Sequence, residues 1–424
     1  MNSIALILGY VWPEPNSSAA GARIVQLIKA LQSRGLEVHF ACAAAPTEHQ
    51  IDLGAMQVTA HTIELNSSSF NQFVATLEPE LVIFDRFVTE EQFGWRVAES
   101  CSGAMRILDT EDLHSLRYAR EKILKKAQKN NQECGPVLAQ SQEIFQVMRE
   151  DELVMREVAA IFRCDLSLMI SEFEIDLLTR FFSVPASLLL HVPFMVECSA
   201  RSTPTFAERE HFVSIGNFRH APNWDAVLWL KQDLWPLLRR RCPSAQLHIY
   251  GAYPPKKATQ LTNPKERFLV KGWADDALQV VENAKVLLAP LRFGAGIKGK
   301  IVDAMRTSTP SVVTSIAAES MAGDCAWPGI VADTKESFVD AAAQIYQNES
   351  HWLLASQACL PLLCSRYDFA MRSEELMSIV CARLQSLERF RRNNFLGGMF
   401  QYHSARSTEF MSRWIEVKSR INAQ

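Results

Sequence analysis

The segment from Leu291 to Met305, LRFGAGIKGKIVDAM, combines glycines, lysines and a carboxylate in a pattern suited to a phosphorylated ligand. Its three glycines and one alanine let backbone amides approach an anion, and the helix predicted to follow directs the positive end of its dipole at the same place. Two lysines add mobile positive charge, and a carboxylate one turn inside the helix can accept two hydrogen bonds from a sugar diol. The pattern predicts a site for a diphosphate joined to a ribose, formed by Gly294, Ala295, Gly296, Ile297, Lys298, Lys300 and Asp303.

Two other nucleotide-binding patterns match this chain poorly. A Walker A loop needs Gly-Lys followed by Ser or Thr, whereas Gly299-Lys300 is followed by Ile301. The first half offers glycines from Gly9 to Gly21, but no GxGxxG motif and no clear acidic partner for a ribose. The sequence therefore disfavours an ATPase and a dinucleotide-binding enzyme. A structural turn with solvated lysines stays open as the alternative for the glycine-rich segment.

Asp112 and His114 are the candidates for chemistry in the first half of the chain. They follow the predicted strand Met105–Leu108, and ligands of open α/β sheets bind beyond the carboxyl ends of the strands. A single histidine is also common as a structural residue, so that alternative stays open for His114.

The elements that position these residues are short apolar strands alternating with helical stretches, in two successive series. Most of the strands are too apolar to have a solvated face, as is typical of parallel strands covered by helices on both sides. Helices such as Ala22–Arg34 and Glu90–Ser100 lie between them. The sequence thus predicts an α/β protein with two doubly wound, Rossmann-like domains. The first series comprises Ile4–Leu8, Glu37–Ala43, Val58–Leu65, Leu81–Phe84, Met105–Leu108, Leu166–Ile170 and Ser187–Val192, and the second comprises His211–Ile215, Gln246–Tyr250, Arg267–Val270, Val286–Ala289 and Ser311–Val313.

Length and composition agree with two domains and restrict the partners. A chain of 424 residues exceeds the usual size of one domain, and the polar segment Glu197–Arg209 is typical of a linker. We expect domains at 1–200 and 201–385, followed by a mostly helical segment at 386–424. The formal net charge of −3 gives no overall electrostatic case for nucleic-acid binding. The ten cysteines are scattered without a CxxC pair, and no cluster of residues has metal-ligand spacing.

Several segments of the second half resemble the retaining GT-B glycosyltransferases, in particular glycosyltransferase family 4. Residues 294–305, GAGIKGKIVDAM, are similar to the donor motif GxGxKxK…EAM of one large branch, and residues 218–226, FRHAPNWDA, are similar to its FxHxPNxDA segment. Gly272-Trp273, Ala289-Pro290-Leu291 and residues 310–313, PSVV, follow in the family's order. In the first half, residues 109–114, DTEDLH, resemble the branch's D-x-x-D-x-H stretch.

The resemblance implies two Rossmann-like domains that face each other across a cleft. The donor would be a nucleoside diphosphate sugar, with a uridine diphosphate sugar favoured, and the acceptor a glycan or a lipid-linked molecule entering from the N-terminal domain. It implies a hexosyltransferase-like enzyme of polysaccharide or glycoconjugate biosynthesis that retains the anomeric configuration and needs no metal and no cofactor. Segment 386–424 would pack back on the N-terminal domain.

The resemblance also implies roles for individual residues. Lys298 would contact the diphosphate, Asp303 the ribose and the Gly272-Trp273 region the base. His114 and Asp112 would lie near the reacting carbon and form the catalytic candidates. The remaining implied contacts to the donor or its diphosphate are Gly21, Gly216, Arg219 and His220.

The chain departs from the wider family in two respects. Ala295 and Asp303 stand where the family has two glutamates separated by seven residues, and the Arg and Lys that many members carry near Gly216 are absent, with Arg219 and His220 as candidate replacements. A non-catalytic relative that binds a nucleotide sugar or glycan, a nucleotide-sugar epimerase and a glycogen-type phosphorylase therefore stay as alternatives.

The sequence favours a cytoplasmic protein. The apolar start Ile4–Trp12 has no basic residue ahead of it and is about half a membrane-spanning length, so it indicates a strand and not a signal peptide. Residues 117–160 have helical composition with a basic first half. That basic half predicts either a solvated helical face or a peripheral contact with an acceptor or with an anionic membrane at its inner face.

Overall fold

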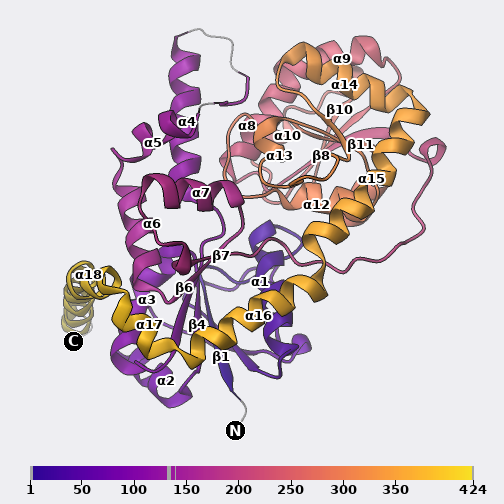
Figure 1. Cartoon of the computed structure of the whole chain (residues 1–424). Helices are drawn as coiled ribbons and strands as arrows, with labels where there is room; N and C mark the ends of the chain where they lie inside the picture. Colours follow the sequence, from indigo (N-terminus) through magenta and orange to yellow (C-terminus); the bar gives the residue numbers. More distant parts are fainter. Residues whose placement is uncertain (1–2, 131–134, 139, 423–424) are drawn as a thin grey trace.

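The computed structural model describes residues 3–130, 135–138 and 140–422 and contains two separate parallel sheets (Figure 1). The seven-stranded sheet has the order β3-β2-β1-β4-β5-β6-β7, and the six-stranded sheet the order β10-β9-β8-β11-β12-β13. The predicted α/β fold with two Rossmann-like domains is confirmed. The strands are β1 (Ile4–Gly9), β2 (Glu37–Cys42), β3 (Thr59–Thr62), β4 (Leu81–Asp85), β5 (Met105–Asp109), β6 (Leu166–Met169), β7 (Leu189–His191), β8 (His211–Ile215), β9 (Leu247–Tyr250), β10 (Phe268–Gly272), β11 (Ala284–Ala289), β12 (Ser311–Val313) and β13 (Gly329–Val331).

Helices cover both faces of each sheet (Figure 1). Every residue of β4 and of β6 is buried, which explains why these strands are mostly apolar in the sequence, with Asp85 at the end of β4 and Ser167 inside β6 as exceptions. The helices of the first domain are α1 (Ala19–Gln32), α2 (Ser69–Leu77), α3 (Arg86–Ser100), α4 (His114–Lys129), α5 (Ser141–Met148), α6 (Glu152–Arg163) and α7 (Glu172–Phe181). Those of the second are α8 (Ala221–Trp229), α9 (Trp235–Arg241), α10 (Lys256–Thr259), α11 (Ala277–Glu282), α12 (Gly299–Arg306), α13 (Ser315–Ala318), α14 (Lys335–Gln347) and α15 (Glu349–Tyr367).

The chain returns from the second domain to the first near Asp368, where Val196 and Asp368 form an isolated parallel bridge. Three further helices follow, α16 (Phe369–Gln385), α17 (Leu387–Asn393) and α18 (Phe395–Asn422), and they run along the first domain (Figure 1). The apolar residues of α16 join the core beneath α1, so residues 369–385 pack with the first domain. The expected division had assigned these residues to the second domain, at 201–385. The expectation missed this because the helical spacing of α16 does not reveal which sheet it covers.

Two further differences from the expected elements have local causes. Strand β13, at residues 329–331, was not predicted, because it is short and begins with a glycine of φ 147°. A Cβ at Gly329 would lie 1.8 Å from the carbonyl oxygen of Ser311, so the pairing with β12 needs glycine there. The helical stretch 117–160 is divided between α4, α5 and α6, and residues 131–134 and 139 within it lie outside the described residues. Among the helices of the described residues, none is long and apolar enough to cross a membrane.

Candidate functional site

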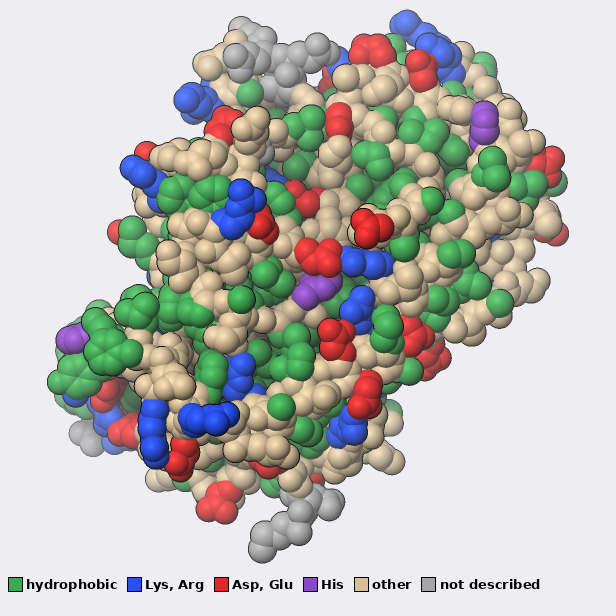
Figure 2. All heavy atoms as spheres, viewed as in Figure 1, with side chains coloured by type: hydrophobic (Ala, Val, Ile, Leu, Met, Phe, Trp, Pro, Cys, Tyr) green, Lys and Arg blue, Asp and Glu red, His purple; other side chains and the backbone are tan. Residues whose placement is uncertain are grey.

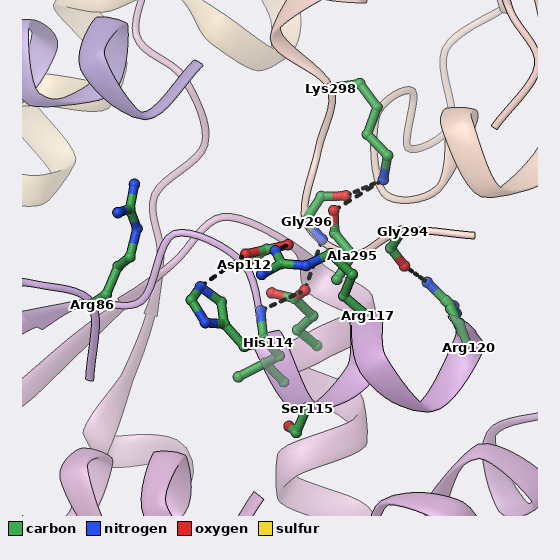
Figure 3. A network of polar contacts seen from close by, with 12 residues as sticks. Arg86, Asp112, His114, Ser115, Arg117, Arg120, Gly294, Ala295, Gly296 and Lys298 are labelled. Carbon is green, nitrogen blue, oxygen red and sulfur yellow. Dashed lines mark hydrogen bonds and ion pairs between the residues drawn. The ribbon is translucent and has the colours of Figure 1, made fainter. Parts of the chain in front are cut away.

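The glycine-rich segment forms a loop that enters α12 and lies directly against the first domain. Gly296 has φ 63°, a conformation that favours glycine, and a Cβ added there would lie 2.9 Å from Cβ of Asp112. Ala295 is buried in the core of the first domain. The loop of one domain therefore packs onto the start of α4 in the other (Figure 3). We call residues 294–298 the donor loop below.

Two lysines at the start of α12 are held without a carboxylate in direct contact. The ammonium group of Lys298 donates hydrogen bonds to the carbonyl oxygens of Gly296 at 2.6 Å and Ala295 at 3.2 Å. That of Lys300 donates to Oδ1 of Asn223 at 2.7 Å. Burial lowers the pKa of Lys298 to about 8. Burial, and then the charge of Lys298, lowers the pKa of Lys300 to about 7. Both ammonium groups would gain from an anionic partner.

The backbone adds to this positive potential. Lys298 is the N-cap of α12, and no side chain caps the helix there. The first amides of a helix have no partner within the helix and attract anions. Gly216, at the end of β8, lies beside the same point, since a Cβ added to it would be 2.8 Å from Nζ of Lys300. The lysines, the helix start and Gly216 thus surround one place suited to a phosphate group.

Asp112 and His114 face the donor loop from the first domain (Figure 3). Their side chains are 3.6 Å apart, measured from Oδ1 to Nε2, and Asp112 also pairs with Arg117. Burial alone would raise the pKa of Asp112, but Arg117, His114 and His220 lower it well below its usual range. Burial lowers the pKa of His114 to about 4, so its imidazole is neutral at neutral pH.

Glu174 links the two domains and was missed by the sequence analysis. Its Oε1 accepts hydrogen bonds from the backbone amides of Leu113 at 3.2 Å and of Gly296, in the donor loop, at 2.7 Å. Burial raises the pKa of this fully buried carboxyl to about 8. Its position just after β6, at the carboxyl edge of the first sheet, is the signal that could have pointed to it.

Two arginines of the basic stretch predicted at residues 117–160 belong to this interface. Arg117 pairs with Asp112, while Arg120 donates to the carbonyl oxygen of Gly294 at 2.8 Å and pairs with Glu319 at 2.7 Å. They therefore do not belong to a solvated helical face. The lysines further along α4 are exposed, namely Lys122, Lys125, Lys126 and Lys129.

A second group of predicted residues lies at the rim of the interface. The Trp273 ring stacks on His49 of the first domain at 3.9 Å between centroids, and the Arg219 guanidinium lies 3.6 Å above the Tyr253 ring. The Tyr253 hydroxyl donates to Oε1 of Glu14 at 2.8 Å. The Trp273–His49 contact joins the second domain to the loop after β2, and the Tyr253–Glu14 contact joins it to the loop after β1. The sequence did not predict the contacts of His49, Tyr253 and Glu14, because the residues in contact are far apart along the chain.

The remaining predicted residues have separate surroundings. Gly272 has φ 78° and accepts a hydrogen bond at its carbonyl oxygen from the amide of Gly251 at 2.7 Å. A Cβ at Gly21 would lie 2.5 Å from the backbone of Glu14, so the loop before α1 packs closely only against glycine. Asp303 lies 3.4 Å from Arg306 on the same helix, and burial raises its pKa to about 6.

The structure therefore brings only part of the predicted site into one cluster. Among the described residues no group of three or more His, Cys, Asp or Glu side chains could hold a metal ion. A cavity of about 430 Å³ lies elsewhere, between α3, α6 and α18, and none of the predicted site residues lines it. The residues that come together are Asp112, His114, Gly216, His220, Gly294, Ala295, Gly296, Ile297, Lys298 and Lys300, whereas Gly21, Arg219, Gly272, Trp273 and Asp303 contact other groups.

Comparison with known protein families identifies a match over most of the second domain. Residues 209–348 match the family model described as Glycosyl transferases group 1. No curated protein matched the chain in a sequence search.

Solved structures share the fold over nearly the whole chain at low sequence identity. Sucrose-phosphate synthase from Thermosynechococcus elongatus is 13% identical, with a TM-score of 0.66 over 91% of this chain and 100% of that one. Anabaena HepE in complex with UDP-glucose is 12% identical, with a TM-score of 0.63 over 89% and 99%. TarM is 9% identical, with a TM-score of 0.66 over 89% and 98%. The chain thus has the GT-B glycosyltransferase fold, and the group 1 glycosyl transferase match covers most of its second domain.

Proposed function

We propose that this chain is a glycosyltransferase that moves a sugar from a nucleoside diphosphate sugar to an acceptor. The observation that carries the proposal is the position of a buried and a half-buried lysine, Lys298 and Lys300, with lowered pKa at the start of α12, opposite Asp112 and His114 of the other domain. The group 1 family match covers the same segment, and the GT-B fold brings the two domains together at it.

The lysines and the helix start would bind the diphosphate of the donor. An anion restores the charged state that burial disfavours, so Lys298 and Lys300 would bind a diphosphate and take up protons with it. The same groups would stabilise the charge that develops on the departing diphosphate. We therefore propose transfer without a metal ion, with these residues in the role that a divalent cation has elsewhere.

The first domain would supply the groups near the reacting carbon. His114 is neutral at neutral pH and held against the ring of Phe87, so it can exchange hydrogen bonds with a sugar hydroxyl without adding charge. Asp112 stays ionised beside it. We propose that residues 1–200 bind the acceptor and 201–385 carry most of the donor site. Retention would follow if the leaving diphosphate takes the acceptor proton.

The similar structures favour a uridine nucleotide and a glycan acceptor. Anabaena HepE was solved with UDP-glucose, and Staphylococcus aureus TarM with UDP, fondaparinux and a GlcNAc-glycerol. We extend these ligand classes to this chain as part of the proposal, together with a role in polysaccharide or glycoconjugate biosynthesis in the cytoplasm. A lipid-linked acceptor fits the same chemistry.

One observation favours the second candidate, a non-catalytic binder of nucleotide sugars. Ala295 occupies the first of the two positions at which the wider family has glutamate, and its side chain is buried against the first domain. A methyl group there offers no hydrogen bond to a donor sugar.

A two-stage experiment tests the proposal. The melting temperature is first measured with uridine, guanosine, thymidine and adenosine diphosphate sugars, because a bound nucleotide stabilises the folded state by mass action. The stabilising donor is then incubated with glycan and lipid-linked acceptors, and release of the free diphosphate is measured. Acceptor-dependent release supports a transferase. Stabilisation without release under any acceptor supports the binder, and no stabilisation by any of the nucleotides contradicts both.

A further inference from the structure

The last helix, α18, packs on the first domain through its small and polar residues. Its Ser404 accepts a hydrogen bond from Arg163 at 2.7 Å and its Ser412 from Arg96 at 2.9 Å, while Glu416 accepts from the backbone amide of Ser68 at 3.0 Å. A Cβ at Gly397 would lie 2.3 Å from the carbonyl oxygen of Phe162, which places the backbone of α18 close against α6. The inward face of this helix therefore consists mainly of small and polar residues, with Phe400 against Phe162 as a large apolar contact.

The large apolar residues of α18 point outward instead. The most exposed of them include Phe395 at 74%, Ile421 at 66% and Phe410 at 63%. Their spacings, mostly three or four residues, place them on one face of the helix, where Arg406 lies between Tyr402 and Phe410. Figure 2 shows hydrophobic side chains gathered over α18 at the lower left edge, with Lys and Arg side chains nearby. The exposed apolar face comprises Phe395, Leu396, Met399, Tyr402, Phe410, Trp414, Val417 and Ile421.

This arrangement is the reverse of the usual one for a helix on a folded domain. A surface helix normally buries its apolar stripe and exposes its charges. A continuous exposed apolar face of this size indicates a surface that binds a partner. The apolar face of α18 cannot pack on the first domain, because the opposite face of the helix is the one that contacts α3 and α6.

The charge of the C-terminal segment indicates which partner fits. Residues 386–424 contain seven Lys and Arg against three Glu, a formal charge of +4, whereas the whole chain carries −3 and the remainder therefore −7. Basic side chains lie on the apolar face itself, with Arg406 4.1 Å from the Tyr402 ring centroid and Lys418 4.9 Å from that of Trp414. Aromatic rings beside basic groups are typical of helices that lie in the interfacial region of a membrane.

We propose that α18 binds the surface of an anionic phospholipid bilayer, with its apolar face in the acyl-chain boundary and its basic residues among the headgroups. Lys and Arg side chains near such a surface are attracted to its anionic headgroups, and burial of the apolar side chains adds to the binding. A second copy of the chain fits less well, because two α18 helices, each with four Lys and Arg against two Glu, would face each other with like charge. The inference is independent of the proposed transfer reaction.

Vesicle flotation tests it with matched variants. The wild-type chain should float with vesicles of phosphatidylcholine and phosphatidylglycerol, and about tenfold less with phosphatidylcholine alone. The variant F410S/W414S/I421S should lower binding to the anionic vesicles by at least about tenfold. A control, L353S/L354S, removes two exposed leucines of α15, and its binding should equal that of the wild type.

The charge and the oligomeric state are tested on the same proteins. R406E/K418E should remove the preference for anionic vesicles, and raising the salt concentration should weaken wild-type binding. Circular dichroism and the melting temperature establish that each variant is folded, and nucleotide-induced stabilisation should be unchanged in all of them. Absence of wild-type flotation overturns the proposal, as does equal binding by the F410S/W414S/I421S variant. A wild-type dimer in sedimentation that this variant converts to a monomer, without flotation, would assign the face to a second copy.

Discussion

At the scale of single residues, the two lysines of the candidate site are notable for the kind of atom that they contact. Within the part of the chain that the structure describes, Lys298 and Lys300 donate hydrogen bonds only to neutral oxygens, those of two backbone carbonyls and of one side-chain amide. An ammonium group buried without a carboxylate partner is costly, which is why burial lowers the pKa of both. The proposed diphosphate would give both ammonium groups the anionic partner that favours their charged state.

Replacing Lys298 with Ala should weaken binding of the nucleoside diphosphate by about 1.5–3 kcal/mol, the range for a hydrogen bond to a charged group. Calorimetry with the purified variant measures the loss. Lys271→Ala is the matched control, because Lys271 is an exposed lysine on β10 of the same domain. Affinity unchanged by Lys298→Ala would remove this lysine from the proposed site.

Asp303 allows two interpretations that Asp303→Asn separates. A carboxylate near a helix N-terminus that merely complements the dipole contributes about 0.3–1 kcal/mol to stability and is unrelated to a ligand. A ribose contact predicts little change in melting of the free protein and at least about tenfold weaker nucleotide binding. In the free protein the Asp303 carboxylate contacts Arg306 on the same helix. Asp303→Asn is therefore a direct test of the ribose contact that the family resemblance implies. Parent-like binding by the variant would end the ribose assignment.

At the scale of elements, the donor loop is shaped by its contact with α4. Gly296 combines φ 63° with a close approach to Asp112, and its amide is held by Glu174. The conformation of the donor loop therefore depends on the contact between the two domains.

Gly296→Ala should disturb that feature specifically. The added Cβ would lie 2.9 Å from Cβ of Asp112, so the loop must shift or the domains must separate. Nucleotide affinity and turnover should both fall, while a control with open space around it, Gly103→Ala, leaves both unchanged. Small-angle scattering of the two variants would show whether the domains have moved apart. Parent-like turnover by Gly296→Ala would mean that the loop adjusts freely.

The sequence predicted the strands and the donor loop well, because both depend on local patterns. Apolar runs identify β4 and β6, and the glycines and lysines of residues 294–300 are adjacent in the chain. Glu174, Arg120 and His49 could not be predicted, since each acts on a residue that is more than 100 positions away. The packing of α16 on α1 was missed for the same reason.

At the scale of the molecule, the two domains meet through polar contacts as well as through small apolar clusters such as that of Leu124, Val137 and Phe293. Arg120 with Glu319, Tyr253 with Glu14 and Asn217 with Ser17 each join one domain to the other. Interfaces between domains of this kind permit relative motion, and a ligand that binds both sides shifts the population toward the closed form.

The proposed independence from a metal ion concerns the whole site and is tested by chelation. Turnover should survive an excess of EDTA, because the proposed charge neutralisation comes from Lys298, Lys300 and the start of α12. Turnover is measured before and after chelation and again after adding manganese. Loss of turnover that manganese restores would overturn the metal-free mechanism.

The dependence of stability on pH should have opposite signs in the free and the nucleotide-bound protein. Lys298 and Lys300 have folded-state pKa values of about 8 and about 7, below the ordinary lysine value of 10.5. In the free protein the unfolded chain therefore binds more protons between those values and the ordinary one, so these two groups make the folded state more stable as the pH rises through that window.

A bound diphosphate reverses the preference, because it favours the charged lysines. Binding should then take up protons, and the nucleotide-induced rise in melting temperature should decrease from about pH 6.5 to about pH 9. Calorimetry at about pH 8 in two buffers of different ionisation enthalpy measures the uptake directly, and Lys300→Ala should reduce it. Equal heats in both buffers, with a melting-temperature rise that does not depend on pH, would show that these lysines do not meet the diphosphate.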